Sequence, residues 1–163
     1  MGVEMTGRSF AGLTLDEPRI MGIVNVTPDS FSDGGETFQR DDALARGRAM
    51  IAAGADILDI GGESTRPGAD PVDPDEEIAR VVPVIEVLSA ESALVSIDTR
   101  RTAVMRAAIA AGAKIVNDVT ALTGDEGSMA VVAEAGVDVI LMHMQGEPRN
   151  MQANPTYDDV VAR

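Results

Sequence analysis

Cysteine and tryptophan are absent from this chain of 163 residues. Without cysteine there are no disulfides, no thiolate metal ligands and no cysteine nucleophile, which agrees with a reducing compartment such as the cytoplasm. Aromatic residues make up only 2% of the sequence, so methionine, alanine, valine and isoleucine must fill the core. We therefore interpret the nine methionines as core residues rather than as metal ligands or a partner surface.

Basic residues are also scarce, because 13 Lys and Arg stand against 27 Asp and Glu and give a formal net charge of −14. Such a surface repels nucleic acid and anionic lipid. No run approaches the roughly 20 apolar residues that span a bilayer, and the N-terminus lacks the pattern of a secretory signal. We predict a cytoplasmic protein that binds neither nucleic acid nor membranes.

Short apolar runs alternate with segments of helical periodicity. The predicted strands are residues 20–26, 56–60, 94–98, 115–119 and 138–143. The predicted helices are residues 40–53, 74–89, 100–111, 126–135 and one that begins near Tyr157. Short, unbroken apolar strands that are joined through helices are typical of a parallel sheet covered on both faces.

The helix boundaries carry their own signals. Asp73 and Pro74, followed by acids at 75–77, predict a capped helix start rather than a metal cluster. Residues 7–19 precede the first strand, and we predict a short hairpin that closes the floor of the fold. Three glycines end predicted helices just before the next strand, as left-handed stops do: Gly54, Gly112 and Gly136.

A polar residue ends each predicted strand. These residues are Asn25, Asp59, Asp98, Asn117 and His143. An open doubly wound sheet concentrates ligand contacts at one switch point, whereas a barrel shares one mouth among all its loops. The pattern therefore favours an α/β fold, a (β/α)8 TIM barrel that is incomplete here, with about five of eight strand–helix units in one domain over residues 1–163 and truncated at the C-terminus.

Spacing adds two finer predictions. Asp59 and Asn117 each lie five residues after a helix-ending glycine, which predicts a similar depth in the fold. Asp59 is interpreted as a residue that orients loop amides rather than a catalytic group. His143, the only histidine, lacks the spaced partners of a zinc site, so we predict a packing role for it.

Two loops that follow strands have compositions suited to ligands. Residues 25–35 form a long strand–helix connection that carries one of only three phenylalanines. Residues 59–69 place paired glycines beside a hydroxyl group and an arginine, which suits the close approach of an anion. Ordinary turns use the same residue types, so either loop alone is weak evidence for a ligand site. The evidence is stronger because the two loops follow neighbouring strands and lie at the same face.

These motifs resemble the N-terminal portion of dihydropteroate synthase. The resemblance rests on the first loop with residues 20–24 before it, and on the Gly-Gly-Glu-Ser-Thr-Arg-Pro-Gly string of the second loop. It continues through Ser96–Thr99, Ile115–Asp118, Leu141–Gly146, Met151–Gln152 and Tyr157. It thus covers nearly everything after residue 18.

The resemblance implies a magnesium-assisted enzyme that joins 6-hydroxymethyl-7,8-dihydropterin diphosphate to para-aminobenzoate and releases pyrophosphate. By position, Asn25 is implied as the ligand of Mg²⁺, a hard cation that prefers oxygen. Asp98 and Asn117 are implied as pterin-binding residues. A carboxylate accepts the adjacent amino group and ring N–H of a pterin, and an amide matches the remaining edge because it both donates and accepts.

The second loop and the first loop are implied to hold the rest of the substrates. Thr65 would contact the diphosphate, and Arg66 would supply the catalytic positive charge for the leaving group. Phe31 and Pro67 would form walls for para-aminobenzoate, with Ser64 nearby.

Two other functions remain open from the sequence. One is a corrinoid-dependent pterin methyltransferase, and the other is a non-catalytic pterin-binding remnant or fragment. Relative to the implied family, three strands and the helices of its homodimer interface are missing. We therefore expect these 163 residues alone to be inactive and prone to aggregate.

Overall fold

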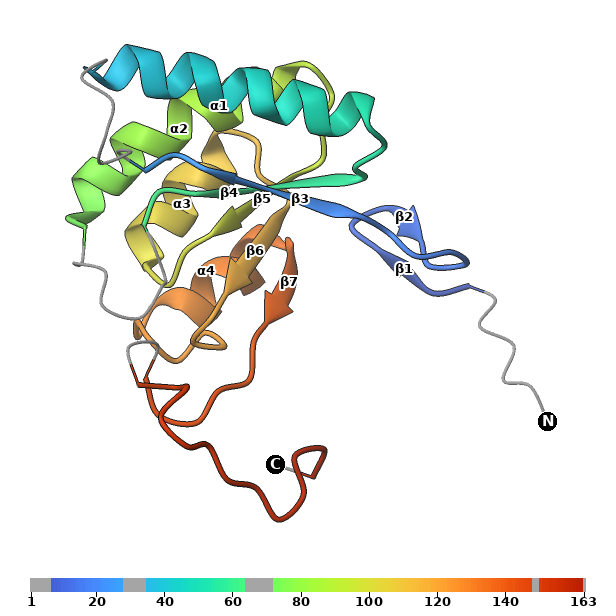
Figure 1. Cartoon of the computed structure of the whole chain (residues 1–163), viewed down its shortest axis with the longest axis vertical. Helices are drawn as coiled ribbons and strands as arrows, with labels where there is room; N and C mark the ends of the chain where they lie inside the picture. The colour runs from blue at the N-terminus through green and yellow to red at the C-terminus, as the bar shows by residue number, and fades with distance from the viewer. Residues whose placement is uncertain (1–6, 28–34, 64–71, 148–149, 163) are drawn as a thin grey trace.

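A computed structural model describes residues 7–27, 35–63, 72–147 and 150–162, with the backbone alone for 35–39. A five-stranded parallel sheet runs in chain order, and a two-stranded hairpin stands apart from it (Figure 1). The hairpin strands are β1 (Ser9–Phe10) and β2 (Leu13–Thr14), and the sheet strands are β3 (Met21–Asn25), β4 (Ile57–Gly61), β5 (Val95–Asp98), β6 (Ile115–Asp118) and β7 (Asp138–Leu141). The helices are α1 (Gly35–Ala52), α2 (Pro74–Ala90), α3 (Thr102–Ala110) and α4 (Ser128–Ala135).

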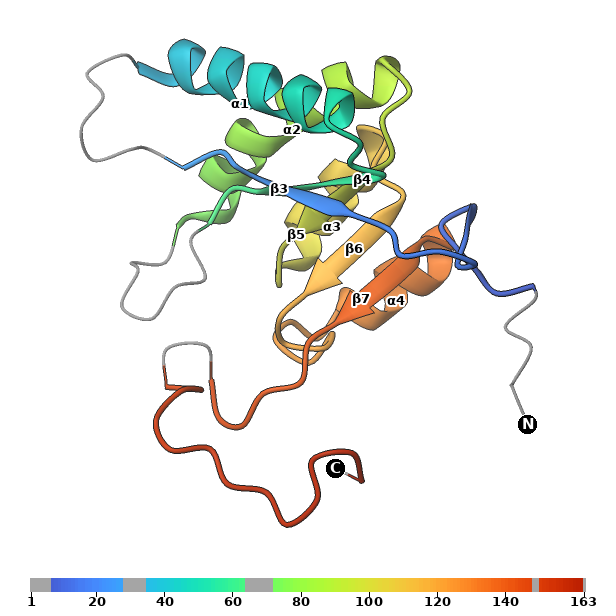
Figure 2. The same ribbon diagram turned by 45° about the vertical axis from the view of Figure 1, so that its right-hand side comes forward.

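All four helices pack on the same face of the sheet, as two views show (Figures 1 and 2). Strand residues that point to this face join the helices in one hydrophobic core, which includes Val24, Leu58, Ile60, Val95, Ile97 and Val116. The opposite face bears no helix within the described ranges, and we call it the helix-free face. The sequence had predicted a sheet covered on both faces, and the described residues cover only one. Five consecutive parallel strands with helices on one side form the predicted wall of a (β/α)8 barrel.

Two rows of side chains lie across the helix-free face, because parallel register places every second residue of each strand there. The mouth row, toward the carboxyl ends of the strands, contains Asn25, Gly61, Asp98, Asn117 and Ile140. The deep row, one layer below it, contains Ile23, Asp59, Ser96, Ile115 and Asp138.

The two rows correct one prediction. Asp59 lies in the deep row and Asn117 in the mouth row, so the predicted similar depth of the two residues is wrong. Equal spacing from a helix end does not give equal height, because neighbouring strands of a barrel wall are staggered.

The predicted cap of α2 and the three predicted helix stops are confirmed, whereas α1 begins five residues before its predicted start. Asp73 accepts a hydrogen bond of 2.9 Å from the backbone N–H of Asp75, with Pro74 in the first turn of α2. The three helix-ending glycines all have positive φ, at +102° for Gly54, +119° for Gly112 and +62° for Gly136, a conformation that glycine adopts without steric cost.

The predicted hairpin is also confirmed, and it lies at the amino-terminal end of β3 (Figure 1). Arg19 donates from Nε to the Thr14 carbonyl oxygen at 2.8 Å, and its guanidinium reaches Asp56 at 3.3 Å. Asp56 in turn accepts from the backbone N–H of Ile20 at 2.8 Å. These bonds tie the hairpin to the start of two sheet strands.

The helix predicted near Tyr157 is not observed, since residues 157–162 form bends without helical turns. Val160 and Val161 are exposed, and a short helix without an apolar partner is only marginally stable in water. The Gln145 side chain holds the preceding segment in place. It donates from Nε2 to the Thr156 carbonyl oxygen at 3.1 Å and accepts from the Thr156 N–H at 2.9 Å.

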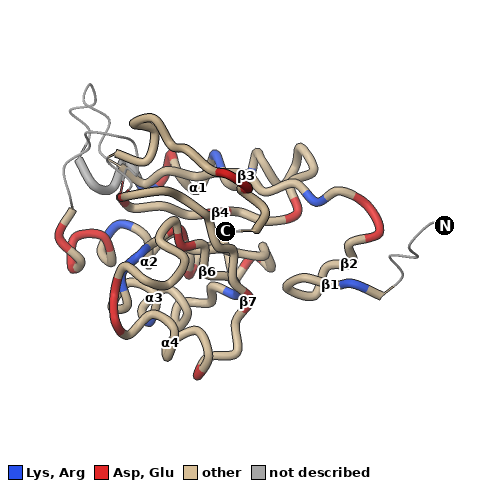
Figure 3. The backbone as a smooth tube through the Cα atoms, turned by 90° about the horizontal axis from the view of Figure 1, so that it is seen from below, with Lys and Arg blue, Asp and Glu red and all other residues tan. Residues whose placement is uncertain are grey.

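Acidic and basic residues are interspersed along the described chain, and no long basic stretch interrupts them (Figure 3). Within the described ranges, every helix is too short or too polar to cross a membrane.

Candidate functional site

The mouth row brings together three residues that the sequence singled out. Asn25, Gly61, Asp98 and Asn117 are consecutive register partners on four neighbouring strands. A Cβ atom at Gly61 would lie 3.7 Å from Asp98 Oδ2 and 3.8 Å from Asn25 Oδ1. The carboxylate and the amide oxygen therefore converge over a position where the chain has no side chain.

Asp98 is the electrostatic centre of this row. Burial raises the pKa of its carboxyl group to about 7, and the negative charges of Asp59 and Glu77 add to the rise. Its Oδ1 atom is buried and accepts no hydrogen bond from the described residues. A buried acceptor without a donor costs free energy, so this position suits a ligand that brings N–H groups.

Asp59 lies directly below, in the deep row, and is only 2% exposed. Its Oδ2 accepts a hydrogen bond of 2.9 Å from Asn117 Nδ2. Burial raises the pKa of Asp59, and the polar side chains of Ser96 and Asn117 partly offset this rise. The sequence had suggested that Asp59 orients loop amides, but its partner is the side chain of a mouth-row residue.

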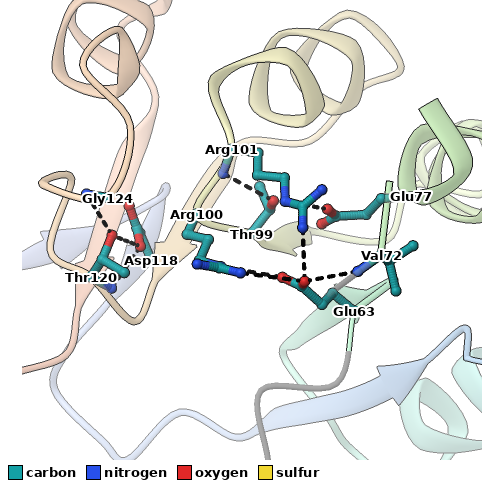
Figure 4. A network of polar contacts seen from close by, with 9 residues as sticks. All are labelled: Glu63, Val72, Glu77, Thr99, Arg100, Arg101, Asp118, Thr120 and Gly124. Atoms are coloured by element: carbon teal, nitrogen blue, oxygen red, sulfur yellow. Dashed lines mark hydrogen bonds and ion pairs between the residues drawn. The ribbon is translucent and has the colours of Figure 1, made fainter. Parts of the chain in front are cut away.

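Glu63, in the second loop, binds Val72 and the two arginines that precede α3 (Figure 4). Its Oε1 accepts from the backbone N–H of Val72 at 3.1 Å and from Arg101 Nη2 at 2.8 Å, and Oε2 accepts from Arg100 Nε at 3.3 Å. Burial alone would raise the pKa of Glu63, but the donors from Arg100 and Val72 outweigh it and hold the pKa below its usual range. Residues 63 and 72 are thereby fixed beside the start of α3.

Glu77 completes this network from α2 (Figure 4). It is fully buried, and Arg101 Nε lies 3.6 Å from its Oε2. Burial raises its pKa, and the nearby Thr99 and Arg101 counteract the rise.

Glu77 lies in the first turn of α2, as the sequence predicted, but its burial was not predicted. The available signal was helical periodicity, since Glu77 falls on the buried stripe of α2 with Val81, Val84, Ile85 and Leu88.

Two further acids at this edge hold loops. Asp118 accepts from the backbone N–H and the hydroxyl of Thr120, both at 2.7 Å (Figure 4). It also accepts from the Leu122 N–H at 3.1 Å. Asp125 accepts from the Thr102 N–H at 2.9 Å and so caps α3 from another loop. Both residues are thus occupied by backbone donors, and the sequence analysis had not identified them.

His143 is not at a strand end, because β7 stops at Leu141. It is exposed, and its ring packs against Tyr157 with 5.4 Å between the centroids, which agrees with the predicted packing role.

A cation at the mouth row would find one suitable neutral ligand, Asn25 Oδ1, close to Asp98. The described ranges contain no group of three or more His, Asp or Glu able to hold a metal. Mg²⁺ commonly binds through one or two protein oxygens with phosphate oxygens and water. The donor set therefore fits a cation that arrives with a phosphorylated ligand.

The remaining predicted site residues lie outside the described ranges and stay predictions. They are Phe31, Ser64, Thr65, Arg66 and Pro67. The chain leads into them directly from β3 and β4, the strands that carry Asn25 and Gly61.

Comparisons with known proteins agree with this geometry. Residues 21–163 match the family described as pterin binding enzyme. A dihydropteroate synthase of Neisseria meningitidis serogroup C is 56% identical over 162 residues, which is 98% of this chain and 56% of that protein.

Two solved structures are also similar. Xanthomonas albilineans dihydropteroate synthase with 4-aminobenzoic acid has a TM-score of 0.81 and 55% identity, over 93% of this chain and 54% of the other. Burkholderia cenocepacia dihydropteroate synthase complexed with 7,8-dihydropteroate has a TM-score of 0.75 and 50% identity, over 92% and 50%. The chain thus spans about half the length of the relatives it matches.

Proposed function

Because this chain belongs to the family of pterin binding enzymes, we propose that it serves the reaction of dihydropteroate synthase in folate biosynthesis. In that reaction 6-hydroxymethyl-7,8-dihydropterin diphosphate and para-aminobenzoate give 7,8-dihydropteroate and pyrophosphate. The observation that carries the proposal is the mouth row, where Asn25, Asp98 and Asn117 converge and Asp98 keeps a buried, unpartnered oxygen. The similar synthases that hold 4-aminobenzoic acid and 7,8-dihydropteroate support it.

The mouth row is chemically suited to one edge of a pterin. The amino group and the adjacent ring N–H of the pterin are two donors side by side, and the Asp98 carboxylate accepts both. The Asn117 amide offers an acceptor and a donor to the neighbouring ring atoms. Donors on the ligand also favour the ionised form of Asp98, so binding lowers the pKa that burial has raised.

The reaction needs no protein nucleophile. The bond between the pterin methylene carbon and the diphosphate oxygen breaks, and the oxygen keeps the electron pair. The amine of para-aminobenzoate then bonds to that carbon and loses a proton. The main demand on the protein is to bind the pterin ring and to stabilise the departing charge. We assign the first task to Asp98 and Asn117 and the second to Thr65 and Arg66.

Magnesium belongs to the proposal as well. Asn25 would hold it through its amide oxygen, and the ion would neutralise charge on the diphosphate. Phe31, Ser64 and Pro67 are assigned to the para-aminobenzoate side. The absence of cysteine agrees with a cytoplasmic location, and a homodimer remains a prediction from the family.

Calorimetric titration of a complete barrel that carries these residues, with 6-hydroxymethyl-7,8-dihydropterin diphosphate and Mg²⁺, tests the assignment directly. We expect Asp98→Ala to abolish detectable binding, because it removes the acceptor for two ligand donors. Asp138→Ala is the matched control, since Asp138 is an exposed acid on the same face, and it should bind as the unmodified chain does. Unchanged affinity in Asp98→Ala would falsify the pterin assignment. Formation of 7,8-dihydropteroate from both substrates is the assay for the complete reaction.

A further inference from the structure

The hydrogen bond between Asp59 and Asn117 crosses a strand. Asp59 lies on β4 and Asn117 on β6, and β5 runs between them. Their side chains nevertheless meet at 2.9 Å between Oδ2 and Nδ2. The deep-row residue of the intervening strand is Ser96, which is fully buried. Its small side chain leaves room for the contact above it.

This contact determines how the Asn117 amide is oriented. An ionised carboxylate only accepts hydrogen bonds, so the amide nitrogen must face Asp59 and the amide oxygen must point away. One proton of Nδ2 is used by Asp59, which leaves the oxygen and a second N–H for other partners. The terminal torsion of asparagine is otherwise broad and easily reversed.

Asp59 itself is poorly placed to touch a ligand. It lies one layer below the mouth row and is 2% exposed, whereas Asn117 is half-buried. It also makes no hydrogen bond to a backbone loop in the described residues, unlike Asp118 and Asp125. Its role is therefore different from that of the acids that hold loops.

We infer that Asp59 is a positioning residue, which holds the Asn117 amide so that its oxygen and free N–H keep a fixed order along the mouth row. The ligand class is the pterin edge, and in this respect the inference rests on the proposed function. A fixed amide recognises a donor and an acceptor in one order only and loses no torsional freedom on binding. A free amide would accept either order and bind less tightly.

Two variants separate orientation from charge. Asp59→Asn keeps an oxygen that accepts from Asn117 Nδ2, whereas Asp59→Ala removes the acceptor. With 6-hydroxymethylpterin as the calorimetric probe, we expect Asp59→Ala to bind roughly ten- to a hundredfold more weakly. Asp59→Asn should stay within about threefold of the unmodified chain, since a retained hydrogen bond preserves most of the effect. Ser96→Ala is the matched control, because it changes a buried neighbour of Asp59 and leaves the Asn117 bond intact.

A second measurement needs no ligand. In the NMR spectrum of the free chain, the Asn117 side-chain amide protons, identified by their loss in Asn117→Ala, should exchange slowly with water. Slow exchange should persist in Asp59→Asn and Ser96→Ala and disappear in Asp59→Ala.

The outcomes are distinct. Unchanged Asn117 resonances in Asp59→Ala overturn the positioning role. Weak pterin binding by Asp59→Asn also overturns it, because charge or direct ligand contact would then be the cause, and this variant decides the question even if Asp59→Ala does not fold. If a complete barrel that carries these residues binds no pterin while Asn117 exchange responds to Asp59→Ala as expected, the proposed function fails and the structural role of Asp59 stands.

Discussion

The two faces of the five-stranded sheet are built on opposite principles. On the helix-covered face most strand residues are buried and apolar, such as Ile97 and Leu58, and the buried acid Asp118 is satisfied by hydrogen bonds from Thr120 and Leu122. On the helix-free face, the same strands present Asp59, Ser96 and Asp98, and each of these has a buried oxygen without a hydrogen bond from the described residues.

The difference shows where stability and function are separated in this fold. Apolar burial stabilises the folded chain by about 25 cal/mol per Å², and it occurs where helices cover the sheet. Buried polar atoms without partners cost free energy unless a ligand or water satisfies them. A row of such atoms on one face of a sheet therefore indicates binding rather than folding.

The largest expected effect tests the helix-covered face. Ile97→Ala should destabilise the chain by about 2–5 kcal/mol, because it leaves a cavity between the sheet and the helices. Ile97 is 0% exposed, whereas Ile23, on the helix-free face, is 57% exposed. The matched Ile23→Ala should cost about 0.5 kcal/mol. Urea denaturation of both variants measures the contrast, and equal losses would show that the two faces do not differ in this way.

The helix-covered face was the more predictable of the two. Apolar periodicity predicted the five strands to within two residues at each end, and the caps at Asp73 and Gly136 marked helix ends correctly. These features are local, because a strand pattern or a cap is decided by neighbours in sequence.

The candidate site was predicted as a set of residues but not as an arrangement. Asn25, Asp98 and Asn117 were singled out, and the structure brings them together. The layer of Asp59 was wrong because it depends on strand stagger. The burial of Glu77 was missed although the helical periodicity of α2 indicated it, and only its ion pair with Arg101 depends on a residue far along the chain. Long-range register is not encoded in local spacing.

The next largest effect is the pH dependence of stability that Asp98 produces on the helix-free face. The pKa of Asp98 is raised from 3.8 to about 7 in the folded chain, so the folded state binds a proton more tightly than the unfolded state does. The contribution of Asp98 to the stability of the ligand-free chain is therefore most favourable below about pH 4, becomes less favourable between pH 4 and 7, and is constant above. Each pKa unit corresponds to about 1.4 kcal/mol.

Replacing this carboxyl group should remove the part of the pH dependence that is due to Asp98. Asp98→Asn should leave stability nearly unchanged at pH 4 and raise it by about 2–4 kcal/mol at pH 8, where the charged form is disfavoured by burial. Urea denaturation at both pH values measures this, with Asp138→Asn as the exposed control on the same face. Loss of stability at pH 8 in Asp98→Asn would mean that the charged carboxylate supports the fold.

The smallest effect concerns an acid on the helical side of the molecule. There the charged carboxylate should stabilise the folded chain, whereas the charge of Asp98 destabilises it. Asp125 accepts from the Thr102 N–H at 2.9 Å and supplies the cap that α3 lacks at its own start. Hydrogen bonds from Thr102 and Gly127 hold its pKa below the usual range. Its contribution is thus present above the unfolded pKa near 4 and is lost as the pH falls through the folded value.

Asp125→Ala should therefore destabilise the chain at pH 7 by about 1 kcal/mol, the usual cost of a lost cap. Glu126→Ala is the control, because Glu126 is an exposed neighbour in the same loop and should change stability by less than about 0.5 kcal/mol. The two variants should converge as the pH falls through the folded pKa of Asp125, because the protonated cap no longer favours the folded state. If Asp125→Ala instead stabilised the chain at pH 7, as we expect for Asp98→Asn, acids on the two sides would act alike. The division between a stabilising side and a binding side would then fail.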